Sequence, residues 1–333
     1  MTLGCCTRRR GTWRGVTTVM LSALAVALGL SPARAQYPDR PVRIILPYGP
    51  GGVADVTTRL VAQKLSERLG RQFIVDNRPG AGGIVAAQSV ISSPHDGYTI
   101  FLTGNGTAIA MSQFKSLPYD VIRDFKSISL MAKFDVLLAV KGDSGLDSVA
   151  KLVAYGRANP GKLNFGSIAP GTTQHLSAEL FRILTDLKAT VITYRSSPEV
   201  ITALLRGDVD VAFDYLAAYR PTMTDGKLRI IATGGDQPTS QLPAVPTVKD
   251  SGYPDYIATS WNALAAPSGV PPDIIAKLNR EVNQVLMDPE IQQRAAQFGM
   301  EALGSTPDQL TDRMKSDIVK WGQVIDKIGL PKQ

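Results

Sequence analysis

The residues best placed to bind a small anion lie where an apolar stretch, residues 42–47, turns into an amphipathic one. A strand that turns at glycine into a helix leaves unpaired main-chain N–H groups at the helix start, and such groups bind anions. Gly51 and Gly52 could therefore face an anion, or they could only make a tight turn. Asp55 stands where an acid favours a helix start, and we favour capping over ligand binding for it.

A second polar segment, residues 103–107, follows another predicted strand. Thr103, Asn105 and Thr107 supply two hydroxyls and an amide at the carboxyl end of that strand, where open α/β sheets bind ligands. A polar turn without a ligand would use the same residue types. Ile109 occupies the third glycine position of a dinucleotide-binding motif, so the segment does not favour a dinucleotide.

A third segment, residues 166–175, again joins a strand to a helix through small and hydroxyl residues. Thr172 or Thr173 could cap this helix while Ser167 and the free N–H groups face a carboxylate. For His175 we favour capping or packing over ligand binding. A phosphate would normally recruit Arg or Lys, and the segment contains neither.

A further candidate is Asp214, which ends an apolar strand and could orient a ligand hydroxyl or ammonium group. Capping of the next helix is the reading we favour for it. The region after residue 35 contains two histidines, His95 and His175, and no cysteine, so we expect no zinc-type metal site. It also lacks a G-x-S-x-G nucleophile motif. We therefore expect neither a cofactor nor an enzyme.

Apolar β-branched runs alternate with amphipathic stretches along most of the chain, which predicts an α/β fold with largely parallel sheets. The predicted strands are residues 42–47, 73–77, 98–103, 127–132, 135–140, 164–166, 190–194, 209–214, 228–233 and 257–265. The predicted helices are residues 55–69, 84–92, 148–159, 172–184, 198–206, 215–225, 271–287, 289–298 and 307–328. The last three begin at proline, which suits a first helical turn.

Two of the predicted strands suggest how the chain is divided. Residues 135–140 leave one α/β region, and residues 257–265 could return to it. A chain that crosses out and back in this way makes two lobes with a hinge and a cleft between them. About 300 residues would normally form two such domains.

The first 35 residues read as an export signal. Arg8, Arg9 and Arg10 precede an apolar run at 16–30, and a small-x-small cleavage motif ends at Ala35. We favour Sec export over twin-arginine export. Five of the 36 Lys and Arg residues lie in this segment, which leaves 31 basic against 29 acidic residues. This balance gives no reason to expect nucleic acid or a membrane surface as a partner.

Several short motifs occur in a fixed order. In this order the sequence resembles the Bug family of periplasmic solute receptors, the binding-protein component of tripartite tricarboxylate transporters. The likeness covers essentially the whole chain after residue 35. The matching segments are residues 37–42, 50–55, 76–83, 94–98, 117–120, 159–164 and 242–247.

This resemblance implies a type II periplasmic-binding-protein fold, with one lobe from 36–138 and 260–333 and the other from 139–259. It implies a monomer in the periplasm that binds a small carboxylate through main-chain amides, hydroxyls and ordered waters. The implied ligand-binding residues are Tyr48, Gly51, Gly52, Asp55, Thr103, Asn105, Thr107, Ser167, Thr172, Thr173, His175 and Asp214. Two positions depart from the family pattern. Ala108 stands where many members have histidine, and Arg195 could meet a distal carboxylate or pair on the surface.

The function that we expect is capture of an organic mono- or dicarboxylate, with an aromatic body as one option, for delivery to a tripartite tricarboxylate transporter. Closure would be a hinge motion around the bound ligand. A second hypothesis is a ligand-sensing receptor that presents its bound form to a signalling partner. A periplasmic hydrolase that uses His175 with Ser167 or Thr172 is the hypothesis that we favour least, because the spacing supports no catalytic triad.

Overall fold

The computed structural model describes residues 1–4, 37–223 and 225–333. The predicted export signal therefore falls outside the described residues from residue 5 onward. The chain divides into two units, Met1–Asp39 and Arg40–Gln333, and the second unit contains all the helices and strands described below. Within the described residues, no helix combines the length and the apolar content that crossing a membrane requires.

One group of strands is built around a parallel core at the start of the second unit. Strand β1 pairs in parallel with β2 and β3, and β9 then pairs antiparallel with β3 and β4. Ile44, Ile45 and Leu46 of β1 are at most 1% exposed, because this strand lies between two neighbours and is covered by helices. The elements of this group are β1 (Val42–Leu46), α2 (Val53–Leu69), β2 (Phe73–Asn77), η1 (Ala81–Gly83), α3 (Ile84–Ile91), β3 (Thr99–Gly104) and α4 (Asn105–Gln113).

A second group of strands forms the other lobe. Strand β5 pairs in parallel with β6 and β7, and β4 joins this sheet antiparallel to β7 and β8. The rings of Phe165, Phe181 and Phe213 pack at centroid distances of 5.4 to 5.8 Å in its core. The elements are α5 (Val149–Ala158), β5 (Asn164–Ile168), α6 (Thr173–Thr185), β6 (Thr190–Tyr194), α7 (Ser197–Arg206), β7 (Val211–Tyr215), α8 (Leu216–Met223) and β8 (Leu228–Thr233).

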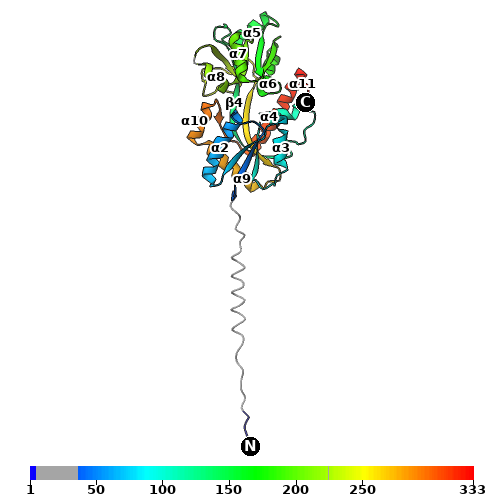
Figure 1. The fold of residues 1–333 in the computed structure, drawn as a ribbon, viewed down its shortest axis with the longest axis vertical. Helices are drawn as coiled ribbons and strands as arrows, with labels where there is room; N and C mark the ends of the chain where they lie inside the picture. Colours follow the sequence, from blue (N-terminus) through cyan, green and yellow to red (C-terminus); the bar gives the residue numbers. More distant parts are fainter. Residues whose placement is uncertain (5–36, 224) are drawn as a thin grey trace. The chain divides into compact units, whose positions relative to one another are not determined.

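The two lobes are joined by β4 (Phe125–Lys141) and by the segment that leads back into β9 (Thr259–Pro267), as Figure 1 shows. Strand β4 pairs with β9 as far as Asp135 and with β7 from Val136 onward. At this point the Val136 N–H group donates to the Ala258 carbonyl over 2.9 Å. The sequence predicted two strands, 127–132 and 135–140, where the structure has one. Because β4 continues unbroken from one sheet into the other, the connection has main-chain partners along its length.

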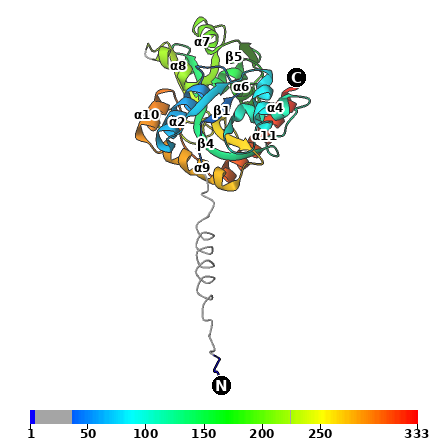
Figure 2. The same cartoon turned by 60° about the horizontal axis from the view of Figure 1, so that its bottom comes forward.

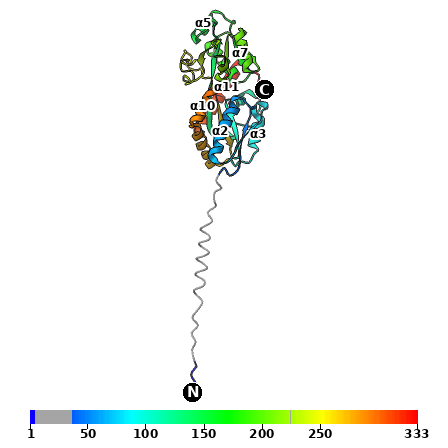
Figure 3. The same ribbon diagram turned by 60° about the vertical axis from the view of Figure 1, so that its left-hand side comes forward.

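Three helices form most of the C-terminal part of the chain, and the last of them packs against both lobes. They are α9 (Pro272–Leu286), α10 (Pro289–Gln297) and α11 (Pro307–Ile328), with the two-residue strand β10 (Glu301–Ala302) before α11. Leu310 and Met314 of α11 belong to the core of the first lobe, whereas Trp321 and Val324 belong to the core of the second. Figures 2 and 3 show this helix beside elements of both lobes. Helix α11 is therefore a third link between them.

Three elements were not predicted from the sequence: the 3-10 helix η1, strand β10 and helix α4. Strand β10 is too short for a periodic signal. Helix α4 begins at Asn105, within the segment that the sequence suggested could be a polar turn. Asn, Gly and Thr are poor helix formers, but the helix buries Ala108 and Ile109 completely or nearly so. Tertiary packing therefore stabilises helix α4, as it often does for short helices.

Gly234 provides a test of how tightly the connection between the lobes is packed. Its N–H group donates to the Val136 carbonyl, and a Cβ atom there would lie 2.9 Å from that oxygen and 2.8 Å from the Ala258 carbonyl oxygen. Both obstacles are main-chain atoms and cannot rotate away. We expect Gly234→Ala to lower the free energy of unfolding by about 1–3 kcal/mol.

Urea unfolding of the two proteins measures this loss. Gly49→Ala is the matched control, because a Cβ at Gly49 would meet no atom within 4 Å. Equal unfolding free energies for Gly234→Ala and Gly49→Ala would contradict the packing described here.

Candidate functional site

A cavity of ≈ 260 Å³ lies between the lobes. The first lobe contributes the turn after β1 and the beginnings of α2 and α4, through Tyr48, Gly52, Val53, Ala54 and Gly106. The second lobe contributes the beginning of α6 and the end of β7, through Thr172, Thr173, Gln174 and Tyr215. The two connecting strands contribute Phe134, Ser260, Trp261 and Asn262.

Three helix N-termini thus meet at one cavity. Helix α2 follows Gly52 and α4 follows Gly104, and neither helix has a side-chain cap. Helix α6 is capped by Thr172, whose hydroxyl accepts from the His175 N–H group over 3.2 Å. The first N–H groups of a helix have no partner within the helix and carry its positive dipole end. This cavity therefore offers main-chain donors from both lobes to a negatively charged ligand.

The turn before α2 is stabilised by Gly51 and Asp55, two of the residues that the sequence indicated. Gly51 adopts a φ of +86°, a conformation that a residue with a side chain rarely takes. Its N–H group donates to Asp55 over 3.0 Å. Burial would raise the pKa of the Asp55 carboxyl, but hydrogen bonds from Arg59, Gly51 and Asn77 outweigh burial and hold this pKa below its usual value. Asp55 therefore acts in the structure as the negative partner that orders this turn.

Two hydrogen-bonded paths connect the cavity wall with α11. Trp261 donates from its indole N–H group to Asp317 over 2.6 Å. On the other path Trp321 donates to the Asn105 side-chain oxygen, and the Asn105 amide donates to the Thr173 hydroxyl, both over 2.8 Å. Asn105 belongs to the first lobe and Thr173 to the second, so the second path bridges the cleft.

Of the residues singled out in the sequence, some line the cavity and others lie outside its wall. Tyr48, Gly52, Thr172 and Thr173 are in its wall. Gly51, Asn105, His175 and Asp214 contact or adjoin wall residues. Asp55, Thr103, Thr107, Ser167 and Arg195 do not line it. Their roles in ligand binding stay predictions.

Arg195, one of the departures from the family pattern, has an exposed side chain, and its main-chain N–H group donates to Glu199 over 3.2 Å. It does not line the cavity. Of the described residues that do, none is Lys, Arg, His, Asp or Glu. A negative charge entering this cavity must therefore be met by neutral donors.

The hydrolase hypothesis finds no support in the hydrogen bonds around His175. The His175 ring accepts from the Gly171 N–H group at 3.4 Å, which matches a neutral imidazole. Burial lowers the pKa of this histidine. The Ser167 hydroxyl donates to the Ile168 carbonyl and the Thr172 hydroxyl to the Ala169 carbonyl. Within the described part of the chain, no three His, Cys, Asp or Glu residues gather as metal ligands.

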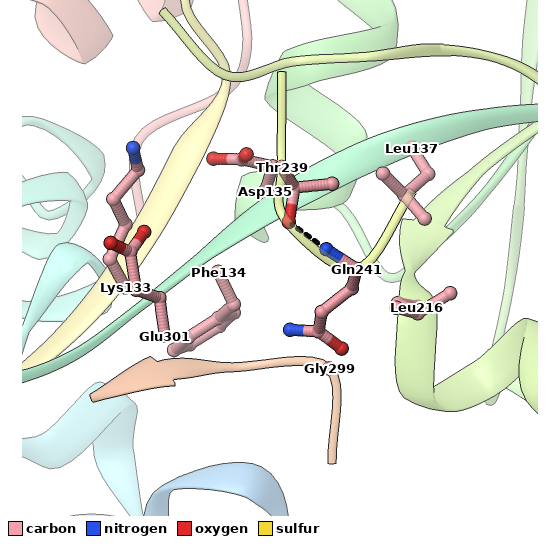
Figure 4. A pocket seen from close by; sticks show the side chains of 9 residues that line it. All are labelled: Lys133, Phe134, Asp135, Leu137, Leu216, Thr239, Gln241, Gly299 and Glu301. Carbon is pink, nitrogen blue, oxygen red and sulfur yellow. Dashed lines mark hydrogen bonds between the residues drawn. The ribbon is translucent and has the colours of Figure 1, made fainter. Parts of the chain in front are cut away.

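Phe134 also lines a second, smaller pocket. Figure 4 shows its ring at one side of that pocket, with the side chains of Lys133, Asp135 and Glu301 nearby. Gln241 donates from its main-chain N–H group to Thr239 over 3.4 Å on the opposite wall. The volume is only ≈ 20 Å³, about that of one water molecule. This pocket is therefore a packing gap at the hinge.

Sequence reasoning missed the part of the cavity wall that comes from the connecting strands. Ser260 and Asn262 alternate with apolar residues in β9, which is buried throughout. Two polar side chains on one face of a buried strand were a usable signal. Phe134 and Tyr215 gave no such signal, because an aromatic residue in a strand is normally interpreted as part of the hydrophobic core.

Residues 57–330 match the family described as the tripartite tricarboxylate transporter family receptor, TctC. The chain is 34% identical over 295 residues to protein BugT of Bordetella pertussis. This alignment covers 88% of this chain and 90% of BugT. Among solved structures, Rpa4515 of R. palustris with adipate is 32% identical, with a TM-score of 0.75 over 88% of this chain and 98% of that one.

MatC of Rhodopseudomonas palustris, solved with bound malate, is 27% identical, with a TM-score of 0.70 over 87% of this chain and all of that one. These matches span nearly the whole described fold, from the parallel core of the first lobe to the C-terminal helices. They agree with an α/β periplasmic-binding-protein fold. The chain therefore belongs to the TctC/Bug family of solute-binding receptors for tripartite tricarboxylate transporters.

Proposed function

We propose that this receptor captures a small organic carboxylate in the cavity between its lobes and delivers it to the membrane components of a tripartite tricarboxylate transporter. The observation that carries the proposal is the meeting of three helix N-termini at one cavity in whose wall none of the described residues has a charged side chain. Relatives with the same fold were solved with adipate and malate, which are both carboxylates. Family members are periplasmic receptors, and we propose export to the periplasm for this chain.

We further propose that the lobes comprise residues 36–138 with 260–333 and residues 139–259, and that they close on the ligand as hinged bodies. Two observations support these limits. Strand β4 changes its partner strand between Asp135 and Val136, and β9 begins at Thr259. Closure would bring the start of α6 toward the start of α2, so that a single ligand accepts hydrogen bonds from both lobes.

Delivery can be separated from signalling in a deletion strain. If the receptor serves a transporter, deletion abolishes growth on the captured carboxylate as the sole carbon source. If it serves a sensor, growth persists while the transcriptional response to that carboxylate is lost. We expect loss of growth.

Our first prediction for this site concerns Gly52. Its backbone is extended, with φ −79° and ψ 171°, and a Cβ atom there would meet no atom within 4 Å. Gly52→Val should therefore fold normally, but its side chain would fill space next to the N–H groups of α2. We expect the melting-temperature increase caused by carboxylates in the wild-type protein to disappear in this variant.

A thermal-shift screen across mono- and dicarboxylates provides the readout. Gly49→Val is the control, because Gly49 lies in the same turn, is equally unobstructed and does not line the cavity. A Gly52→Val protein that keeps the full ligand-induced shift would refute the assignment of this cavity as the binding site.

Our second prediction concerns pH. Asp214 is 1% exposed, and burial raises the pKa of its carboxyl although the nearby Ser197 and the hydrogen bonds from Tyr215 and Gln174 oppose the increase. A raised native pKa means that the folded state binds more protons than the unfolded state between the two pKa values. Stability therefore falls as pH rises through that window. Asn at this position does not titrate, so Asp214→Asn should not show this loss.

We expect the melting temperature of Asp214→Asn, relative to wild type, to be higher at neutral pH than at pH values below the usual carboxyl range. Differential scanning calorimetry across this range measures the difference. Asp255→Asn, at an exposed position, controls for the removal of one negative charge. A difference that is the same at every pH would argue against a raised Asp214 pKa.

A further inference from the structure

We infer that this receptor selects a monocarboxylate with an uncharged aromatic body, which packs against Phe134 and Tyr215 while its carboxylate accepts a hydrogen bond from Asn262. The inference rests on the proposed function, because it assigns a ligand class to the same cavity. It differs from what the ligands of the two solved relatives would suggest, since adipate and malate each carry two carboxylates.

The apolar part of the wall is an aromatic corner. Phe134 of β4 and Tyr215 of β7 both line the cavity, and their rings meet edge to face, with centroids 4.8 Å apart and planes at 83°. Ser260 and Thr173, both wall residues, can partner the Tyr215 hydroxyl. The inference uses the Tyr215 ring, whose contact with Phe134 the structure shows. Two perpendicular rings can contact a third ring by its face and by its edge, and both contacts are favourable.

The polar part of the wall contains a donor without a partner. The Asn262 side-chain amide nitrogen is buried, has no hydrogen-bond partner, and belongs to a residue that lines the cavity and is 5% exposed. Leaving a buried amide unpaired costs free energy that a ligand can recover. An NH₂ group can only donate, so the group that satisfies it must be an acceptor. A carboxylate oxygen fits, and the carboxylate would also face the N–H groups at the beginnings of α2 and α6.

The charges around the cavity argue against a second carboxylate on the ligand. No described residue in the wall is basic. The nearby Arg59 is already paired with Asp55 and bonded to Asn77. Behind Gln174 lies Asp214, whose second carboxyl oxygen is buried without a partner. A distal carboxylate would therefore be buried without a counter-ion, close to an acidic group, and such burial is costly.

Calorimetric titration of the full-length exported protein with benzoate, adipate and malate tests the inference. We expect benzoate to bind at least tenfold more tightly than either dicarboxylate. Tighter binding of adipate or malate would overturn the inference and leave the proposed function standing. If none of the three binds and no carboxylate in the thermal-shift screen raises the melting temperature, both the inference and the proposed function are wrong.

Two variants test the named contacts. Phe134→Leu keeps an apolar side chain but removes the ring, so we expect benzoate affinity to fall roughly two- to tenfold. Phe298→Leu, at a residue that is 40% exposed and does not line the cavity, is the matched control. Equal benzoate affinity in Phe134→Leu and wild type would contradict the inference that the Phe134 ring contacts the ligand.

For the polar contact we expect Asn262→Ala to weaken benzoate binding by about ten- to a hundredfold, the range for a hydrogen bond to a charged group. Because the Asn262 amide nitrogen has no partner in the unliganded protein, removing it should change the melting temperature without ligand little. Asn159→Ala, on the outer surface of the second lobe, is the control. Unchanged benzoate affinity in a folded Asn262→Ala protein would contradict the assigned role.

Discussion

If the cavity binds a carboxylate, as we propose, its negative charge must be held between two lobes by groups that carry no full charge, and the rest of the structure is arranged around this constraint. Burying a carboxylate is unfavourable unless each of its oxygens finds donors. Helix beginnings supply such donors, and the cavity has three of them. Each must be aimed at the same point, so the strands β1, β3 and β5 that precede these helices must end at the cleft. Residues that follow these three strands do line the cavity, namely Gly52 after β1, Gly106 after β3 and Thr172 after β5.

The connections between the lobes must then allow movement without losing this alignment. Strand β4 and the segment before β9 are joined by main-chain hydrogen bonds where they cross, and Gly234 fits there because it has no side chain. Helix α11 is hydrogen-bonded to the cavity wall of each lobe, through Trp261 on one side and through Asn105 to Thr173 on the other. Residues of the cavity wall therefore also take part in the hydrogen bonds that join α11 to the lobes.

Much of this arrangement could be predicted from the sequence. Alternating apolar runs indicated the order of strands and helices, and the glycines at 51 and 52 indicated the turn before α2, where Gly52 lines the cavity. Helix α4 escaped prediction because packing, and not propensity, stabilises it. Phe134 and Asn262 were not predicted as cavity residues, because their place in the wall depends on which residues the fold puts opposite them. That Arg195 does not line the cavity also needed the structure, since spacing along a chain says little about side-chain direction.

The most direct test of this account is a crystal structure of the receptor with the carboxylate that raises its melting temperature most. We expect carboxylate oxygens within about 3 Å of main-chain nitrogens, or of waters bound to them, at the beginnings of both α2 and α6. No Lys or Arg side chain should contact the ligand. A carboxylate bound instead by a basic side chain, or contacting one lobe only, would contradict the central claim.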